Sequence, residues 1–259
     1  MFDFAFSFPL IILLVVVAFL SGVGITTVGP GGIFVTISLY SLTPLSSGTV
    51  AGTAHATFIA TGLVGSAAYV HSGEMKTDEA RTMALILSLS SIIGALIGAY
   101  VNSFVPRTIF GLLLGVVAMA TGITIVYRER RGLSSLYQLD VARQEGQVVL
   151  GVLGFALGIT SGLLGVGGPV IAIPALILIG VPMLLALAVA QVQSIFIAAF
   201  ATIGYLFQGN VSLPVAALVG LPLLAGVVVG WKVAHLVNPA KLKVALGIVL
   251  IVVGPYLAL

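Results

Sequence analysis

The chain has 259 residues, of which 60% are hydrophobic and only 7% are charged. A soluble domain carries about 25% charged residues because its surface faces water, so this composition excludes an ordinary soluble globule and indicates a chain surrounded mostly by lipid. The chain has no cysteine, which excludes disulfides, thiolate metal sites and thiol nucleophiles. The net charge is +3, but the sequence has no basic patch interleaved with aromatic residues, so nucleic acid is not an expected partner.

Apolar runs separated by polar or Gly/Pro breaks predict ten segments. In chain order they cover residues 9–28, 33–42, 46–70, 83–104, 108–126, 148–164, 170–179, 183–207, 213–233 and 241–257. Eight of them are long enough for the hydrocarbon core, which needs about 20 helical residues. The second and the seventh are too short, because ten helical residues rise only about 15 Å. We therefore expect an all-α polytopic membrane protein with eight long transmembrane helices and two short broken or half helices.

The two short segments occupy the same place in each half of the chain, which indicates an internal repeat. The matched landmarks, in order, are Ser21-Gly22 with Ser161-Gly162, Pro44 with Pro182, Tyr69 with Tyr205, Gly73 with Gly209, Gly115 with Gly247, and Gly122 with Gly254. An ordered series of this kind favours a repeat, although each match alone is weak. We expect a first transmembrane repeat at residues 1–127, a cytoplasmic linker at 128–147 and a second repeat at 148–259.

The basic residues predict the orientation of these segments, because cytoplasmic loops are enriched in Lys and Arg. If the central linker is cytoplasmic, only Arg107 of the ten Lys and Arg residues faces outward. The basic loops then follow segment three in the first half and segment nine in the second, which are not equivalent positions in the two halves. An odd number of segments per repeat, here five, would produce this difference, because the second repeat then enters the membrane from the opposite side. We therefore predict two inverted five-segment repeats in the cell (inner) membrane, with both termini outside the cytoplasm. Whether the short segments cross fully or return as hairpins stays open, because both alternatives leave every charged loop on the same side of the membrane.

Two glycine-rich breaks precede the short segments: Gly29-Pro30-Gly31-Gly32, and Gly165-Val166-Gly167-Gly168-Pro169 with Pro174 following. With the stretch Ala51-Gly52-Thr53-Ala54 and the Tyr-x-x-x-Gly motifs that begin at Tyr69 and Tyr205, they resemble the TauE/SafE sulfite-exporter family over nearly the whole chain. The resemblance implies passage of sulfite or an organosulfonate such as sulfoacetate. The chain departs from the family pattern at Ala54 and Gln191, which leaves the particular anion open.

Half-helices that begin inside a membrane expose unpaired N–H groups and the positive end of a helix dipole. Two such ends, one per repeat, would converge near the midplane, and glycine lets the backbone approach a ligand closely. The interiors of the apolar segments hold no Lys, Arg, Asp or Glu, so the expected substrate is a small oxyanion and not a cation. The predicted substrate-binding residues are Gly29, Gly31, Gly32, Thr53, His55, Thr57, Gly165, Gly167, Gly168, Gln191, Gln193 and Ser194.

Each of these features also has a structural interpretation. Small residues spaced four apart mediate close helix packing, and the candidate pairs are Gly94/Gly98, Gly111/Gly115, Gly158/Gly162 and Gly226/Gly230. The hydroxyl and amide side chains could simply bond across helices. His55 could couple a proton, contact the anion or be a neutral, hydrogen-bonded histidine.

The leading hypothesis is a secondary transporter that moves one repeat against the other by alternating access. A cytoplasm-negative potential favours anion efflux by about 2.3 kcal/mol per charge per 100 mV, so export is the expected direction. A permease for another small anion or solute is the main alternative. An intramembrane enzyme needs a nucleophile with a base or a metal cluster, and no such motif is present, so no enzyme activity, metal or cofactor is expected. The expected partners are the anion and membrane lipid; the coupling ion and the oligomeric state, a homodimer included, stay open.

Overall fold

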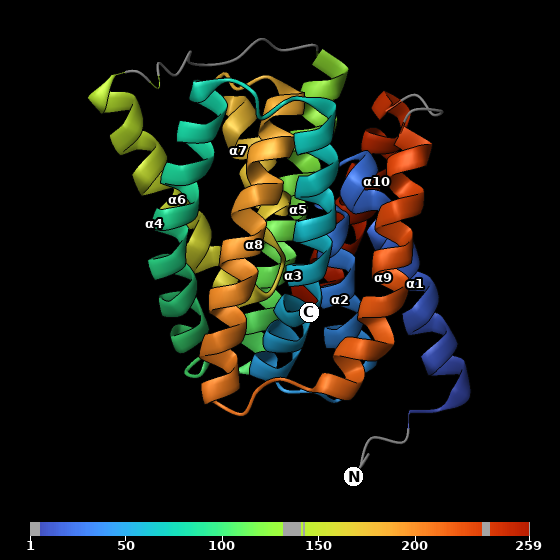
Figure 1. Cartoon of the computed structure of the whole chain (residues 1–259). Helices are drawn as coiled ribbons and strands as arrows, with labels where there is room; N and C mark the ends of the chain where they lie inside the picture. The colour runs from blue at the N-terminus through green and yellow to red at the C-terminus, as the bar shows by residue number, and fades with distance from the viewer. Residues whose placement is uncertain (1–5, 132–140, 142, 235–238, 259) are drawn as a thin grey trace.

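Helices make up nearly all of the structure, a computed structural model that describes residues 6–131, 141, 143–234 and 239–258 (Figure 1). Within these residues there is no strand. The elements are α1 (Phe8–Thr27), the 3-10 turn η1 (Pro30–Gly32), α2 (Ile33–Leu42), α3 (Ser47–Ser72), α4 (Asp78–Asn102), α5 (Arg107–Arg131), α6 (Gln144–Leu164), α7 (Gly168–Leu178), α8 (Met183–Phe207), α9 (Leu213–Ala234) and α10 (Pro239–Ala258). The all-α class expected from the sequence is confirmed.

Among the described residues, six helices are long and apolar enough to span a membrane: α1, α4, α5, α6, α8 and α9. Eight were expected. The helix α3 has 26 residues but is rich in Gly, Ala, Ser and Thr, and α10 contributes the shorter apolar stretch Val244–Leu257. The expected linker at 128–147 overlaps two helices, since α5 continues to Arg131 and α6 begins at Gln144; its residues 132–140 and 142 lie outside the described part.

The short helices α2 and α7 each turn back beside the helix that precedes them, so both form hairpins. A Cβ placed on Gly24 of α1 would lie 3.0 Å from the Cα of Gly31, which brings η1 directly onto the backbone of α1. α7 likewise packs against α6. In Figure 1 the start of α1 and the α2–α3 link lie at the lower end, and the α7–α8 link lies at the upper end. The charged residues left two alternatives open for the short segments, a full crossing or a return as a hairpin. The structure has the hairpin.

The long helices pack in pairs through glycine: α1 with α9, α4 with α6, and α5 with α10. A Cβ on Gly22 would lie 2.9 Å from the Cα of Gly226, and one on Gly94 would lie 3.0 Å from the Cα of Gly158. Such backbone contact is available only to the smallest residues, and it is the packing that small residues provide in membranes. The packing role predicted for Gly94, Gly158 and Gly226 is confirmed.

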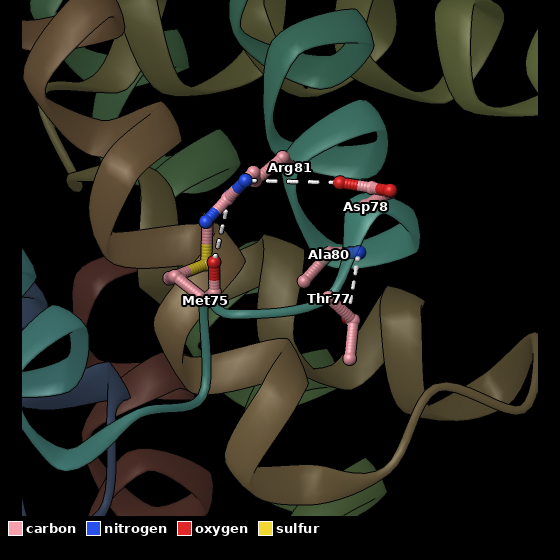
Figure 2. A network of polar contacts seen from close by, with 5 residues as sticks. All are labelled: Met75, Thr77, Asp78, Ala80 and Arg81. Carbon is pink, nitrogen blue, oxygen red and sulfur yellow. Dashed lines mark hydrogen bonds and ion pairs between the residues drawn. The ribbon is translucent and has the colours of Figure 1, made fainter.

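At the link between α3 and α4, polar contacts hold the start of α4 (Figure 2). The Thr77 hydroxyl accepts a hydrogen bond from the Ala80 N–H at 3.2 Å, which caps α4. Arg81 donates to the Met75 carbonyl at 3.2 Å and lies 3.7 Å from the exposed Asp78 carboxylate. Because polar residues cap and open the helix, α4 begins at Asp78, five residues before the apolar run that predicted it.

The C-terminal end of α2 is held by Arg107, the first residue of α5. Its guanidinium donates to the carbonyls of Tyr40, Thr43 and Leu45, with a distance of 2.9 Å to Thr43. It also lies 4.6 Å from the centroid of the Tyr40 ring. A cation at a helix C-terminus satisfies carbonyls that have no partner within the helix, so Arg107 fixes α2 at the lower end of the bundle.

Candidate functional site

A small buried cavity lies where the two glycine-rich breaks meet. Its volume is about 10 Å³, which is room for about one water molecule. Its lining comes from α1, the two breaks, α3, α7 and α8, and comprises Ile25, Gly29, Gly32, Phe58, Thr61, Val166, Gly167, Pro169, Val170, Gln191 and Ser194. Gly31 of the first break and Gly167 of the second are 136 positions apart in the sequence, and the fold brings the two breaks to one place.

Five of the twelve predicted site residues line this cavity. They are Gly29, Gly32, Gly167, Gln191 and Ser194. The three other glycines pack against protein instead. Gly31 lies on the backbone of α1 near Ser21 and Ile25, Gly165 lies against Ala51, and Gly168 lies against Ser194, whose Cα would be 3.0 Å from an added Cβ.

The remaining four predicted residues are buried beside the cavity but are not part of its lining. The Thr53 hydroxyl accepts a hydrogen bond from the Ser212 N–H at 3.0 Å, and the Thr57 hydroxyl donates to the Ala54 carbonyl at 2.7 Å. Gln193 is fully buried, and neither of its amide atoms has a hydrogen-bond partner in the described part of the chain. None of these three side chains belongs to the lining of the cavity.

His55, the fourth of these residues, bonds to the end of α6. Its Nε2–H donates to the Ser161 carbonyl at 2.9 Å, and because a carbonyl only accepts, this bond fixes the proton on Nε2. The ring stacks on Tyr205 with a centroid distance of 6.3 Å and meets Phe58 edge-on at 6.2 Å. The Nδ1 atom has no partner among the described residues. The arrangement is that of a hydrogen-bonded interior histidine.

The carbonyl groups at the C-terminal end of α6 are satisfied by side chains from other helices. Besides His55, the Tyr205 hydroxyl donates to the Gly162 carbonyl at 2.8 Å and the Asn102 amide donates to the Leu163 carbonyl at 2.7 Å. The Thr36 hydroxyl donates to the Gly165 carbonyl. A buried helix end needs such partners, since no water is present to supply them. The second break is therefore fixed by polar contacts from α2, α3, α4 and α8.

The lining of the cavity contains one buried donor without a partner and two glycines with positive φ. The Gln191 amide nitrogen is buried and has no hydrogen-bond partner among the described residues, and the glycines Gly29 (φ 107°) and Gly167 (φ 75°) adopt left-handed conformations just before the two short helices begin. No charged side chain belongs to the lining. Unpaired N–H groups and positive helix ends attract anions. In the described residues no group of three or more His, Cys, Asp or Glu could hold a metal ion.

Six residues of the lining were not predicted as site residues from the sequence: Ile25, Phe58, Thr61, Val166, Pro169 and Val170. Thr61 continues the series Thr53, Thr57 at a spacing of four, so helical periodicity could have found it. Phe58 is a large apolar side chain, and the sequence alone does not distinguish it from any other apolar residue of the core. Its presence in the cavity is decided by how α3 packs.

A second, larger cavity of about 240 Å³ lies next to the first break. Its lining includes Val28 and Pro30 at the break, Ile173 of α7, and Arg128 near the end of α5, a helix that ends at the upper end of the bundle in Figure 1. The side chains of Ile173 and Leu187 lie directly against Gly29, where an added Cβ would be 3.2 Å from Leu187 Cδ2. Gly29 lines the small cavity and Ile173 lines the large one, so the contact of Ile173 with Gly29 joins the linings of the two cavities.

Comparison with known proteins assigns the chain to a family. The family model described as Sulfite exporter TauE/SafE matches residues 10–257. The probable membrane transporter protein YdhB of Bacillus subtilis (strain 168) is 26% identical over 242 residues, which is 90% of this chain and 94% of that protein. No solved structure matches the chain. The match over almost the full length, on a bundle of apolar helices with two glycine-rich breaks, shows that the chain belongs to the TauE/SafE family of membrane transporters.

Proposed function

We propose that the protein exports a small sulfur-containing anion, sulfite or an organosulfonate such as sulfoacetate, across the inner membrane by alternating access of two inverted repeats. The cavity between the glycine-rich breaks is the proposed binding site. Its five predicted residues and Thr61 face the anion, and the other seven predicted residues position them.

The observation that carries this proposal is the convergence of donors on one buried cavity. The starts of both short helices adjoin it, and the Gln191 amide nitrogen in its lining has no partner among the described residues. An unsatisfied buried donor costs free energy of about 1–3 kcal/mol. An anion that accepts from this amide and from the helix starts would remove that cost, whereas a cation would meet donors and positive dipole ends.

The contacts between α5 and α10 support the inverted repeats. Gly115 packs against Gly254, and Gly122 packs against Gly247. The sequence repeat pairs Gly115 with Gly247 and Gly122 with Gly254, so exchanging the two halves converts one contact into the other. The two helices run antiparallel, because the residue number rises in α5 as it falls in α10. A two-fold axis that relates antiparallel helices is perpendicular to them, which is the geometry of repeats with opposite membrane orientation.

The positions of the basic residues support a cytoplasmic upper end, so export would run toward the lower end. Lys76 lies on the α3–α4 link at the upper end, where Arg81, Arg128 and Lys232 lie near the ends of their helices; Arg107 begins α5 at the lower end. By the enrichment of basic residues in cytoplasmic loops, the upper end is the cytoplasmic side. The cavity of about 240 Å³ then lies on the cytoplasmic side of the first break and provides the proposed route of entry.

Transport can be tested in liposomes together with binding to the purified protein. We expect sulfite or sulfoacetate to raise the melting temperature and to leave loaded liposomes only when the protein is present. Gln191→Leu should abolish both effects while the protein remains folded. The matched control is Gln208→Leu, because Gln208 lies near the end of α8 and donates to the Ala99 carbonyl at 3.1 Å, away from the cavity. Binding of a cation or neutral solute, with no response to any sulfur anion, contradicts the proposal.

A permease for another small anion is the second candidate, and the size of the cavity favours it. A volume of about 10 Å³ suits a smaller ion than sulfite unless the site expands. The same assays with chloride separate the two candidates: chloride transport without transport of sulfur anions selects the second.

A further inference from the structure

The ring of Phe58 lies between the two glycine-rich breaks and touches both. A Cβ placed on Gly32 would lie 3.2 Å from Phe58 Cε1, and one placed on Gly167 would lie 3.4 Å from Phe58 Cδ2. The side chain is 2% exposed, and it belongs to the lining of the small cavity. One aromatic ring thus fills the space on which the starts of α2 and α7 converge.

This placement explains why the cavity is so small. The two breaks supply glycine on both sides of the ring; an added Cβ at Gly32 would crowd it at 3.2 Å, and one at Gly167 would reach van der Waals contact with it at 3.4 Å. What remains beside the ring is about 10 Å³. An anion of several heavy atoms needs more room than one water molecule. The ring and the substrate therefore compete for the same volume.

Phe58 also differs from its aromatic neighbours in how it is held. His55 meets the Phe58 ring edge-on and stacks on Tyr205, and His55 and Tyr205 each donate a hydrogen bond to a carbonyl at the end of α6. Phe58 has no polar atom and is held by packing alone. Rotation about its two side-chain torsions costs contacts but breaks no hydrogen bond. Of the three rings, Phe58 is the one that can move without leaving a buried polar group unpaired.

We propose that Phe58 is the specificity-determining residue of the transport site: its ring sets the size of the anion that can reach the two helix starts and moves away from Gly32 and Gly167 when the anion binds. This inference rests on the proposed function for the nature of the substrate. The role of the ring in limiting access can be measured without any substrate.

Access is measured by labelling a single cysteine, which is clean here because the chain has no cysteine of its own. Ser194→Cys places a thiol in the lining of the cavity. A methanethiosulfonate reagent that carries a sulfonate group should label it slowly in the presence of Phe58 and at least tenfold faster when Phe58→Ala is added. Phe58→Leu, which keeps most of the packing, should give an intermediate rate. Equal labelling rates in all three proteins overturn the inference.

The matched control is Phe110→Ala, combined with the same Ser194→Cys. Phe110 is also fully buried, but its ring lies 5.6 Å from that of Tyr40 in the interface between α2 and α5. Its removal costs similar packing without opening the cavity, so labelling should stay slow. If Phe110→Ala accelerates labelling as much as Phe58→Ala does, general loosening explains the result and the inference is wrong.

Selectivity is then measured as the ratio of sulfoacetate efflux to sulfite efflux from liposomes. We expect Phe58→Ala to raise this ratio at least fivefold, because the larger anion gains more from the added space. An unchanged ratio overturns the role in specificity while the proposed function stands. If the unsubstituted protein moves no sulfur anion, the proposed function fails, and the labelling experiment still decides whether Phe58 limits access.

Discussion

The two glycine-rich breaks begin equivalent short helices, yet the protein holds them by different forces. In the described part of the chain, the side chains that lie against the glycines of the first break are apolar: Ile173 and Leu187 lie against Gly29, and Phe58 lies against Gly32. The backbone of the break also meets α1, since the Gly29 N–H donates to the Gly24 carbonyl at 3.0 Å. At the second break, four side chains from four helices donate hydrogen bonds to the carbonyls at and just before Gly165. The first break adjoins the cavity of about 240 Å³ as well.

The difference indicates which side of the site opens more easily. Apolar contacts are non-directional and can be exchanged for others at modest cost. Buried hydrogen bonds are directional, and breaking one leaves a polar group unpaired in a medium that cannot replace it. The polar contacts gather toward the lower end, where Arg107 also fixes α2. We therefore expect the lower end to be the firmly closed side in this conformation.

The largest expected effect comes from Arg107→Met, which removes the donor from three carbonyls beyond the first break. We expect the free energy of unfolding to fall by about 3 kcal/mol, since hydrogen bonds to a charged group contribute about 1.5–3 kcal/mol. Unfolding in mixed micelles with increasing dodecyl sulfate measures it. Arg81→Met is the control, because Arg81 is exposed on the α3–α4 link and its removal should change little. Equal losses for the two variants would show that Arg107 does not fix α2.

The turn at the first break should be the next most sensitive position. Gly31→Ala places a Cβ on the backbone of α1, and overpacking of this kind costs about 2 kcal/mol. Gly151→Ala in α6 is the matched control, because an added Cβ there meets nothing within 4 Å and alanine favours the helix. The same unfolding measurement applies. A Gly31→Ala protein as stable as the control would contradict the hairpin packing.

Removing one donor from the second break tests the polar side of the comparison. Tyr205→Phe keeps the ring but leaves the Gly162 and Leu163 carbonyls without the hydroxyl, and we expect a loss of about 1.5 kcal/mol. Tyr100→Phe serves as the control because Tyr100 is 63% exposed on the outside of the bundle. Transport should also leak in the inward direction if the closed end has been weakened. Unchanged stability would show that this hydrogen bond does not fix the second break, so that polar contacts would not distinguish it from the first.

The smallest effect is expected at the apolar contacts of the first break. Ile173→Val removes one methyl group that lies against Gly29, and we expect a loss of only about 0.5 kcal/mol, at the low end for this substitution, because apolar neighbours can close the gap. Labelling of Ser194→Cys should nevertheless become faster, since the separation between the two cavities is thinner. Ile203→Val, with Ile203 at 42% exposure, is the control. Slower or unchanged labelling would argue against entry by this route.

Local sequence features were enough to predict most of the fold. Apolar runs and Gly/Pro breaks gave α2 and α8 at their observed bounds, 33–42 and 183–207, because hydropathy and helix breaking act within a few residues. The start of α4 was missed by five residues because the Thr77 cap and the charged first turn lie outside the apolar run. The glycines of the breaks and the donor Gln191 were predicted as site residues from the same local chemistry and line one cavity.

Only the tertiary structure decided how these elements meet. The hairpin return of α2 and α7, the ring of Phe58 between the breaks and the bonds that fix the end of α6 depend on which helices become neighbours. The His55 ring bonds to a carbonyl 106 residues away, and the Thr53 hydroxyl accepts from an N–H 159 residues away. Sequence composition specifies that such polar groups favour partners in a membrane, because an unpaired polar group in lipid costs free energy. Which partner each one finds is set by the packing of the helices, through glycine contacts whose geometry no single segment contains.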